Sequence, residues 1–220
     1  MSNQFDKSNV QDVYNQIAHH FDKTRAYLWK GVIIFLEALP KHSLVLDVGC
    51  GNGRNMADIF TQKEPYLQFI GSDFSTEFTD ICFNKGLEVL SDNNLKLSMR
   101  DNIFDAVISI AVIHHLSKKL DRIKCVNELI RVAKPGGRIF IQVWAWERET
   151  GKKYHDQEQM IRWTLDNTYS PTGEKQVLER YYYLFKKGEL ESYMDSSTVK
   201  IIDSYYEKNN WIIILEKKVN

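Results

Sequence analysis

Residues 44–53 have the sequence LVLDVGCGNG, a short apolar run that ends in an aspartate and three closely spaced glycines. A continuous apolar run of this length is typical of a parallel strand that is buried on both faces. Glycines directly after such a strand permit a tight turn and let a ligand approach the backbone amides. This stretch therefore predicts a ligand-binding turn between a buried strand and a helix.

The spacing of the glycines indicates which ligand the turn binds. A dinucleotide fold has the pattern G-x-G-x-x-G, whereas here the pattern is G-x-G-x-G and Arg54 occupies the position of the expected third glycine. S-adenosylmethionine has no pyrophosphate, so the tighter turn preceded by an acid suits it better. We expect Gly49, Gly51 and Gly53 to bind this cofactor, while Asp47 orients the loop and the amino group of the ligand. The alternative is an ordinary strand–helix turn.

Polar residues at the ends of later strands extend the predicted cofactor site. Asp73 ends the second strand, where an acid can accept hydrogen bonds from ribose hydroxyls, although it could instead cap the next helix. Asp92 follows the third strand and could accept from the adenine amine, with Asn93 beside it; an ordinary turn residue is the alternative. Ile110, at the end of the fourth strand, completes the predicted set.

Strands and helices alternate along most of the chain, which predicts a parallel sheet with crossover helices. After residue 144 the pattern changes, and residues 147–179 are polar, aromatic and irregular, so we expect a substrate-side loop or insertion. Two further runs flank residues 208–210 and predict an antiparallel hairpin. The chain is thus expected to be one domain, residues 1–220, with a Rossmann-like α/β fold and a mostly parallel seven-stranded sheet. The expected strands are 44–48, 67–72, 87–90, 104–110, 138–144, 199–206 and 211–216; the expected helices begin near residue 8 and cover 32–39, 52–62, 77–85, 118–133 and 188–194.

Composition and charge exclude several classes of protein. Lys and Arg number 29 and are balanced by 29 Asp and Glu, so no overall charge attracts the chain to nucleic acid or a membrane. No apolar run is long enough to span a membrane, and the first ten residues lack a signal-peptide core. The three cysteines have no paired spacing, which indicates reduced thiols in the cytoplasm or the nucleus and no metal site.

Residues 13–217 resemble the tRNA wobble-uridine methyltransferases that esterify 5-carboxymethyluridine, including the methyltransferase domain of AlkB-like fusions. The resemblance is carried by these motifs: VYNQIA at 13–18, FDKTR at 21–25 with Trp29, LDVGCGNG at 46–53, IGSD at 70–73, SIAVIHH at 109–115, WAWE at 144–147, RYY at 180–182, GEL at 188–190 and YEKNNW at 206–211. The N-terminal Thr24-Arg25, the double histidine and the YEKNNW motif are more specific than the glycine turn. Tyr183 departs from the expected RYYH motif, and residues 159–163 lack the expected proline-containing apolar run.

The resemblance implies the reaction and the partners. The methyl group of S-adenosylmethionine would pass to a carboxylate of the base in a tRNA anticodon loop, and a small zinc-binding activator subunit would assist. The short strand at residues 87–90 would offer that subunit an exposed sheet edge. The alternatives are a methyltransferase for a small molecule, such as a quinone or metabolite acid, and a non-catalytic subunit with the same fold.

The implied reaction suggests which residues handle the substrate. A carboxylate is already anionic, so no general base is needed, and an arginine can hold one of its edges. We expect Arg25, Arg180 and His114 to be catalytic, although each arginine could instead form a surface ion pair. The residues expected to contact the base are Trp29, His115, Trp144, Tyr181 and Tyr182, with core packing as the alternative for at least half of the aromatic ones. Basic residues that could bind phosphates if they converge are Lys23, Arg25, Lys30, Arg148, Lys152, Lys153, Arg162, Lys186 and Lys187.

Overall fold

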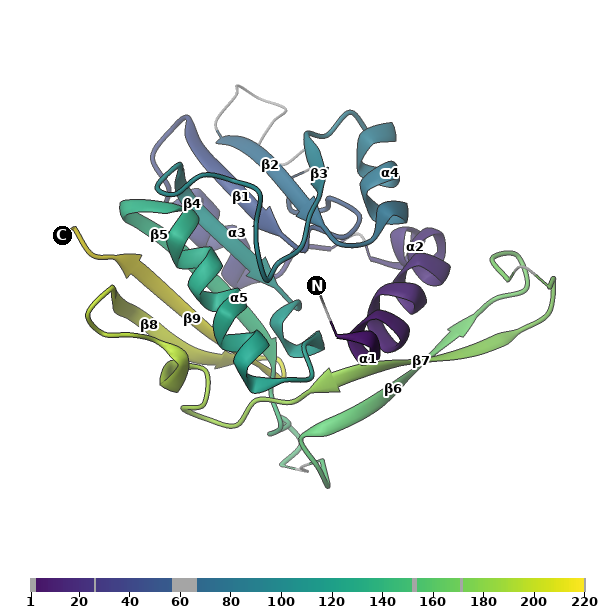
Figure 1. The fold of residues 1–220 in the computed structure, drawn as a ribbon. Helices are drawn as coiled ribbons and strands as arrows, with labels where there is room; N and C mark the ends of the chain where they lie inside the picture. The colour runs from purple at the N-terminus through teal and green to yellow at the C-terminus, as the bar shows by residue number, and fades with distance from the viewer. Residues whose placement is uncertain (1–2, 26, 57–66, 152–153, 171, 220) are drawn as a thin grey trace.

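The computed structural model describes residues 3–25, 27–56, 67–151, 154–170 and 172–219. Its centre is a seven-stranded sheet with the strand order β3-β2-β1-β4-β5-β9-β8 (Figure 1). The strands are β1 (Ser43–Val48), β2 (Leu67–Asp73), β3 (Val89–Ser91), β4 (Phe104–Ile110), β5 (Ala133–Trp144), β8 (Val199–Glu207) and β9 (Asn210–Lys217). Neighbouring strands from β3 to β5 are parallel, whereas β9 is antiparallel to both β5 and β8. The predicted fold, a mostly parallel sheet with an antiparallel C-terminal hairpin, is confirmed.

Helices lie on both faces of the sheet (Figure 1). The described helices are α1 (Gln4–Asp6), the π-helical η1 (Lys7–Gln11), α2 (Asp12–Thr24), α3 (Lys30–Glu37), α4 (Thr76–Asn84), the 3-10 helix η2 (Ile113–His115), α5 (Lys119–Val132) and the 3-10 helix η3 (Glu191–Tyr193). Ser75 is the N-cap residue of α4, because its hydroxyl accepts a hydrogen bond from the Phe78 amide at 3.3 Å. None of the described helices is long and apolar enough to cross a membrane.

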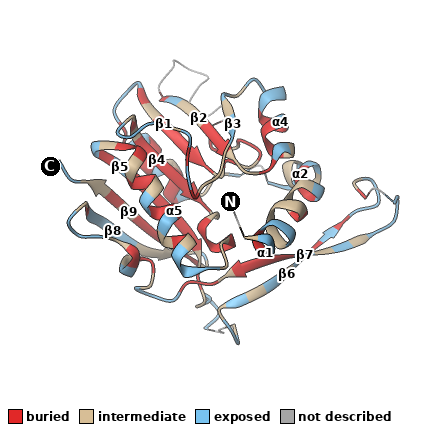
Figure 2. Ribbon diagram, in the orientation of Figure 1, coloured by how far each residue is buried: buried red, intermediate tan, exposed pale blue. Residues whose placement is uncertain are grey.

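Two apolar cores flank the sheet, and β1 contributes to both. Leu46 and Val48 pack into the core that also contains Leu129 of α5, whereas Val45 packs into the core that contains Leu36 of α3. Because successive side chains point to opposite faces, a strand covered on both sides needs apolar residues at almost every position. Figure 2 shows the strands at the centre of the sheet as almost entirely buried. This is the physical reason for the continuous apolar run at residues 44–48.

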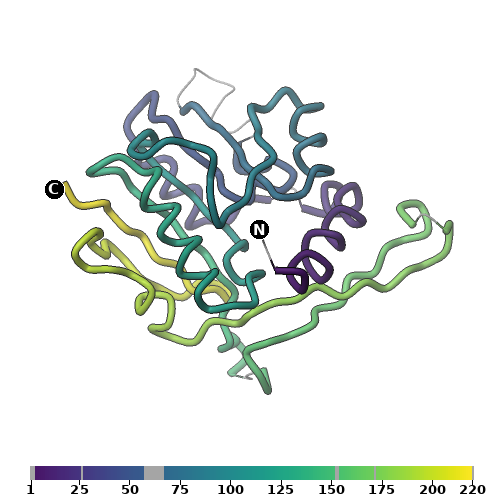
Figure 3. The backbone as a smooth tube through the Cα atoms, in the orientation of Figure 1, coloured from purple at the N-terminus to yellow at the C-terminus, as the bar shows by residue number. Residues whose placement is uncertain are grey.

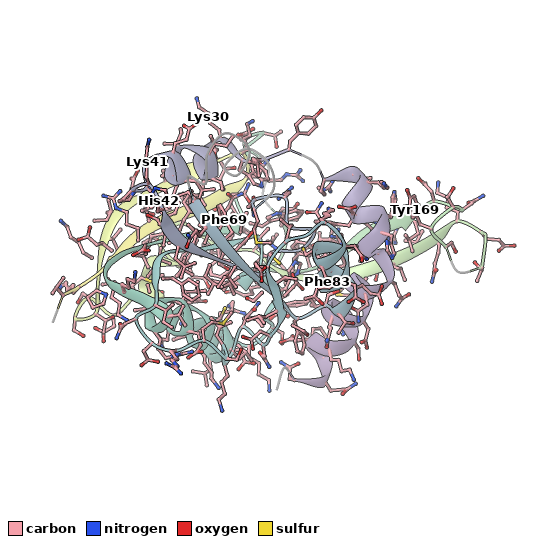
Figure 4. All side chains as sticks on the ribbon, turned by 90° about the horizontal axis from the view of Figure 1, so that it is seen from above. Lys30, Lys41, His42, Phe69, Phe83 and Tyr169 are labelled. Atoms are coloured by element: carbon pink, nitrogen blue, oxygen red, sulfur yellow. The ribbon has the colours of Figure 1, made fainter. Side chains whose placement is uncertain are left out.

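The segment at residues 147–179, which we predicted as an irregular loop or insertion, contains regular structure at residues 158–165 and 176–179. Strands β6 (Glu158–Leu165) and β7 (Gln176–Tyr183) pair antiparallel to form a second, two-stranded sheet, which projects beside α1 and α2 (Figures 1 and 3). Trp163 and Leu165 are buried against Ile17 of α2, while Thr164 between them is exposed. Tyr169, labelled in Figure 4, stacks on His20 of α2 with ring centroids 5.0 Å apart.

Smaller differences concern the ends of elements. The predicted helix at 188–194 is reduced to the three-residue η3, after Gly188 with a φ of 79°. Residues 52–56 form turns, and the rest of the predicted helix at 52–62 lies outside the described residues. Strand β5 begins at Ala133, earlier than the expected residue 138, and so includes the Pro135-Gly136-Gly137 segment. Its pairing with β4 shifts register between Phe104 and Ala106, so the glycines form an irregularity within the strand.

Candidate functional site

A cavity of about 510 Å³ lies at the carboxyl ends of β1, β2 and β4. Ligands of open α/β sheets bind at this edge, and the volume lies within the range of small-molecule sites. The N-terminal helices cover one side, through Asp6, Val10, Gln11 and Tyr14, and β7 closes another with Arg180 and Tyr182. Gln11 fixes the covering helix, because its Nε2 donates to the carbonyl of Phe74 at 3.0 Å. The cavity therefore combines the glycine turn with side chains from both ends of the chain.

The glycine turn is tied to the end of β2. The amides of Gly49 and Cys50 donate to the carbonyl of Ser72 at 2.7 and 3.0 Å, and the Gly51 amide donates to Asp73 Oδ2 at 2.8 Å. Gly49 has a φ of 75°, and a Cβ there would lie 2.3 Å from a methyl group of Val112. Gly49 and Gly51 line the cavity as expected, whereas Gly53 does not.

The two acidic residues predicted around this turn lie in different places. Asp73 lines the cavity, and its Oδ1 accepts from the Ser75 amide at 2.9 Å. Burial raises the pKa of Asp73, and the hydrogen bonds from backbone amides oppose that shift. Asp47 is fully buried outside the cavity lining; its Oδ2 accepts from Asn55 at 3.0 Å, and its Oδ1 has no partner among the described residues. Burial raises the pKa of Asp47 to about 7.

The two residues expected to contact adenine, Asp92 and Asn93, lie outside the lining of the cavity. The carboxylate of Asp92 accepts hydrogen bonds from the Asn93 amide at 2.8 Å and from the Ser98 amide and hydroxyl, both at 2.8 Å. It is therefore a turn residue, and neither Asp92 nor Asn93 lines the cavity. Asn94 lines it instead, and its buried Oδ1 has no hydrogen-bond partner among the described residues. Ile110 lines the cavity as predicted.

The two candidate arginines come together around Trp163 of β6. The guanidinium carbon of Arg25 lies 5.4 Å from the Trp163 ring centroid, and that of Arg180 lies 4.8 Å from it. Both arginines line the cavity, but Arg25 is exposed at the rim whereas Arg180 is 5% exposed. Arg180 has no carboxylate within ion-pair distance among the described residues, and its Nε has no hydrogen-bond partner there. A buried guanidinium without an anion is costly, and it is a strong binding site for one.

The two histidines have separate environments. Trp144 donates its amide to Nδ1 of His114 at 3.1 Å, and the ring of His114 stacks on Tyr182 with centroids 4.8 Å apart. His114 is fully buried and does not line the cavity, so the structure does not support the predicted catalytic contact. His115 does line it, and its Nδ1 donates to the carbonyl of Tyr181 at 2.9 Å. Burial lowers the pKa of both histidines, that of His115 to about 3, so both are neutral.

Of the aromatic residues expected to contact the base, Trp29, Trp144 and Tyr182 line the cavity. Tyr181 does not; its ring packs edge-on against Phe5, with centroids 5.2 Å apart. Cavity-lining residues that sequence reasoning did not assign to the site include Tyr14, Arg54, Phe74, Asn94 and Tyr154. Tyr14 belongs to the VYNQIA motif, but its helical spacing indicated only a packing role.

The predicted basic surface is only partly assembled. Arg25 and Arg148 line the cavity, together with Lys208. Arg162 instead pairs with Glu179 across the β6–β7 hairpin at 3.3 Å, and Lys152 and Lys153 lie outside the described residues. Within the part of the chain that is described, no group of three His, Cys, Asp or Glu side chains could hold a metal ion.

The sequence of the chain is similar to those of known methyltransferases. A family model described as a methyltransferase domain matches residues 46–141. The chain is 34% identical to the tRNA (carboxymethyluridine(34)-5-O)-methyltransferase of Schizosaccharomyces pombe, and the alignment covers 99% of this chain and 100% of that protein. It is also 34% identical to tRNA (carboxymethyluridine(34)-5-O)-methyltransferase alkbh8 of Xenopus tropicalis, where 96% of this chain matches 41% of the longer protein.

Solved structures share the fold. A S-adenosylmethionine-dependent methyltransferase from Clostridium acetobutylicum matches with a TM-score of 0.70 and 17% identity, covering 94% of this chain and 100% of that one. A chain from the complex between the Haloferax volcanii Trm112 methyltransferase activator and a putative methyltransferase matches with a TM-score of 0.65 and 13% identity, covering 95% and 96%.

Proposed function

Since the chain belongs to the tRNA (carboxymethyluridine(34)-5-O)-methyltransferase family, we propose that it transfers a methyl group from S-adenosylmethionine to the carboxylate of 5-carboxymethyluridine at the tRNA wobble position. The predictions of the family, of methyl transfer and of the cofactor are confirmed. The relatives described above are tRNA methyltransferases, which speaks against the small-molecule and non-catalytic alternatives.

Arg180 is the observation that supports a carboxylate acceptor. It is a buried cation without an anionic partner among the described residues, and it lines the same cavity as the glycine turn. A substrate carboxylate would supply the missing negative charge and accept two parallel N–H bonds from one edge of the guanidinium. An uncharged acceptor would leave the guanidinium buried and unpaired.

The residues of the cavity fit S-adenosylmethionine. Asp73 has lone pairs free for ribose hydroxyls in addition to the two amide bonds that it accepts, and the orphaned Oδ1 of Asn94 can accept from the adenine amine. The positive φ of Gly51 and the absence of close neighbours around its missing Cβ leave space beside the turn. Phe74, Ile110 and Val112 provide apolar walls for the adenine ring. The bound cofactor would supply an electrophilic methyl carbon.

The protein then has to position the acceptor rather than activate it. The methyl carbon would pass to one oxygen of the carboxylate as its bond to sulfur breaks, so no side chain would have to take up a proton. Arg180 would hold one edge of the carboxylate and leave a lone pair for the reaction, while Arg25 at the rim would support the approach of the anion. His115 is neutral and its Nδ1–H is already donated to a backbone carbonyl, so it serves as a fixed polar wall rather than a base.

The proposed partners are a tRNA anticodon loop and a small zinc-binding activator subunit. Trp29, Trp144 and Tyr182 offer aromatic surface to the wobble base. Strand β3 lies at the edge of the sheet, with Leu90 46% exposed and the neighbouring Phe83 of α4 76% exposed. Phe83 is labelled in Figure 4. An activator could pair with this edge and cover both side chains. We propose that the enzyme acts in the cytoplasm or nucleus, where its three buried free thiols would stay reduced.

The direct test is incubation with methyl-labelled S-adenosylmethionine and tRNA that carries 5-carboxymethyluridine, with and without the activator. We expect a base-labile methyl ester on the modified tRNA and none on the same tRNA with an unmodified wobble uridine. Transfer of label only to small organic acids, or failure to bind the cofactor even with the activator, would contradict the proposal.

A further inference from the structure

The hydroxyl group of Tyr14 lies at the centre of a hydrogen-bond network in the cavity wall. Its oxygen is 2.9 Å from His115 Nε2, 3.2 Å from the Tyr182 hydroxyl and 3.2 Å from Arg180 Nη1. These partners come from η2 and β7, which are distant from α2 in the sequence. We infer that Tyr14 is a positioning residue that fixes the guanidinium of Arg180 and thereby determines the selectivity of the enzyme for a carboxylate. This inference rests on the proposed function.

The donor and the acceptor of each hydrogen bond in the network can be deduced by starting from the carbonyl of Tyr181. The carbonyl of Tyr181 can only accept, so Nδ1 of His115 carries the proton and donates to it at 2.9 Å. Nε2 of the neutral ring then has only a lone pair, and the Tyr14 hydroxyl must donate to it. The oxygen of Tyr14 is left as an acceptor, so both Arg180 and Tyr182 donate to it.

The donor and acceptor roles in these hydrogen bonds stay the same near neutral pH because His115 does not take up a second proton there. The groups packed around it are the rings of His114, Tyr14 and Tyr182, the backbone of Tyr181 and the guanidinium of Arg180. None of these groups is an acid that would stabilise an imidazolium ion. Burial is the main cause that lowers the pKa of His115, the hydrogen bond to the Tyr181 carbonyl opposes it and the charge of Arg180 adds to it, and together they bring the pKa to about 3.

This arrangement leaves one edge of Arg180 for the substrate. Nη1 is held by Tyr14, whereas Nε is buried without a partner and Nη2 has no hydrogen bond to the described residues. The edge formed by Nε and Nη2 can make two parallel bonds to a carboxylate. A carbamoyl group has one acceptor oxygen and a donor NH2 group, so it satisfies only half of that edge. Because the Tyr14 proton is committed to His115, the tyrosine cannot rotate to compensate for the weaker ligand.

The chain contains a matched control for the loss of a tyrosine hydroxyl. Tyr193 is buried, whereas Tyr14 is half-buried; the Tyr193 hydroxyl accepts from Nε of another buried arginine, Arg122, at 3.2 Å and donates to Oε1 of Glu189 at 3.1 Å. Tyr193 and Arg122 do not line the cavity. Tyr193→Phe therefore removes the same atom from beside the same kind of side chain, away from the site.

The experiment compares the binding of two anticodon stem-loops to the enzyme saturated with S-adenosylhomocysteine. One stem-loop carries 5-carboxymethyluridine and the other carries its uncharged 5-carbamoylmethyl counterpart. We expect Tyr14→Phe to lower the preference for the carboxymethyl form about tenfold, the effect of losing one hydrogen bond to a charged group. The affinity for the carbamoylmethyl form and for S-adenosylhomocysteine should stay within about twofold of wild type, as should the preference of Tyr193→Phe.

The outcomes separate this inference from the proposed function. A wild-type enzyme that makes no methyl ester on modified tRNA contradicts the proposed function itself. A wild-type enzyme that is active, with Tyr14→Phe retaining the full preference, overturns only the role of Tyr14. Equal loss of affinity for both stem-loops and for S-adenosylhomocysteine in Tyr14→Phe would also overturn it, because a general structural role would explain that result.

Discussion

Arg122 and Arg180 are both buried arginines, 3% and 5% exposed, and neither has a carboxylate partner among the described residues. Arg122 is nevertheless well satisfied: it donates to the carbonyls of Leu116 and Ser117 at 2.9 and 2.8 Å, and its guanidinium lies 3.5 Å from the Tyr183 ring centroid. Within the described part of the chain, the side chain of Arg180 makes one hydrogen bond, to Tyr14, and it lines the cavity. The difference shows that burial of a cation does not by itself indicate a binding site, whereas incomplete hydrogen bonding beside a cavity does.

Replacing Arg180 should have the largest effect on activity. Arg180→Met keeps the approximate volume but removes the N–H groups that would hold the substrate carboxylate. Charged hydrogen bonds contribute about 1.5–3 kcal/mol each, so kcat/KM for methyl ester formation on modified tRNA should fall at least about 100-fold. Steady-state kinetics with labelled methyl donor would measure this. Unchanged kcat/KM would show that Arg180 does not hold the substrate.

Arg25 should matter less, because it lies at the solvent-exposed rim. Arg25→Ala removes a cation over the ring of Trp163, but water screens its interaction with the substrate. We expect kcat/KM to fall about tenfold, and this loss should become smaller at higher salt because salt screens the charge of Arg25. The affinity for the cofactor, measured by calorimetry, should not change. A loss as large as that of Arg180→Met would mean that the two arginines share the carboxylate equally.

Replacing Arg122 should affect stability instead of activity. Arg122→Met leaves the carbonyls of Leu116 and Ser117 without their donor and removes the contact with Tyr183. We expect the free energy of unfolding to fall by about 2 kcal/mol, whereas Arg180→Met should leave it unchanged or raise it, because an unpaired buried charge is removed. Urea denaturation of both variants would measure the contrast. Equal destabilisation would refute the distinction between the two arginines.

The smallest expected effect is a difference between Arg180→Met and Arg122→Met in how their stability depends on pH. The folded pKa of His115, about 3, lies below its ordinary value of 6.5, so only the unfolded chain binds the proton between these values. Its contribution to stability is therefore complete above pH 6.5 and is lost as the pH falls towards 3, by up to about 1.4 kcal/mol for each pH unit. The charge of Arg180 is one cause of the low pKa, so the folded pKa should rise in Arg180→Met, and this variant should lose less stability than Arg122→Met between pH 5 and pH 3. Identical losses in unfolding experiments at the two pH values would contradict this link.

The central sheet and the glycine turn could be predicted because their residues are determined locally. A strand buried on both faces needs the apolar run at 44–48, and the turn after it needs glycine at the positive φ of Gly49. The β6–β7 hairpin escaped prediction because only one of its faces is buried, so Trp163 and Leu165 alternate with exposed polar residues. Residues 166–175 separate the two strands, a connection longer than a tight hairpin turn.

The site was harder to predict, because its contacts join distant parts of the chain. Residues 92–94 are three consecutive polar residues, and the sequence does not show which of them lines the cavity. The amide and hydroxyl of Ser98 hold Asp92 in a turn by donating to its carboxylate, and Asn94 is the residue that lines the cavity. Arg180 was predicted from the chemistry of the acceptor, but its partner Tyr14 is 166 positions away in the sequence. No local pattern indicates such a contact, and Tyr14 looked like part of the apolar face of a helix.

The most direct test is a crystal structure of the enzyme with S-adenosylhomocysteine and an anticodon stem-loop that carries 5-carboxymethyluridine. We expect the carboxylate of the base to accept hydrogen bonds from Nε and Nη2 of Arg180, with one oxygen directed at the sulfur atom. A carboxylate bound elsewhere, with Arg180 paired to an acidic side chain of the protein, would contradict the assignment.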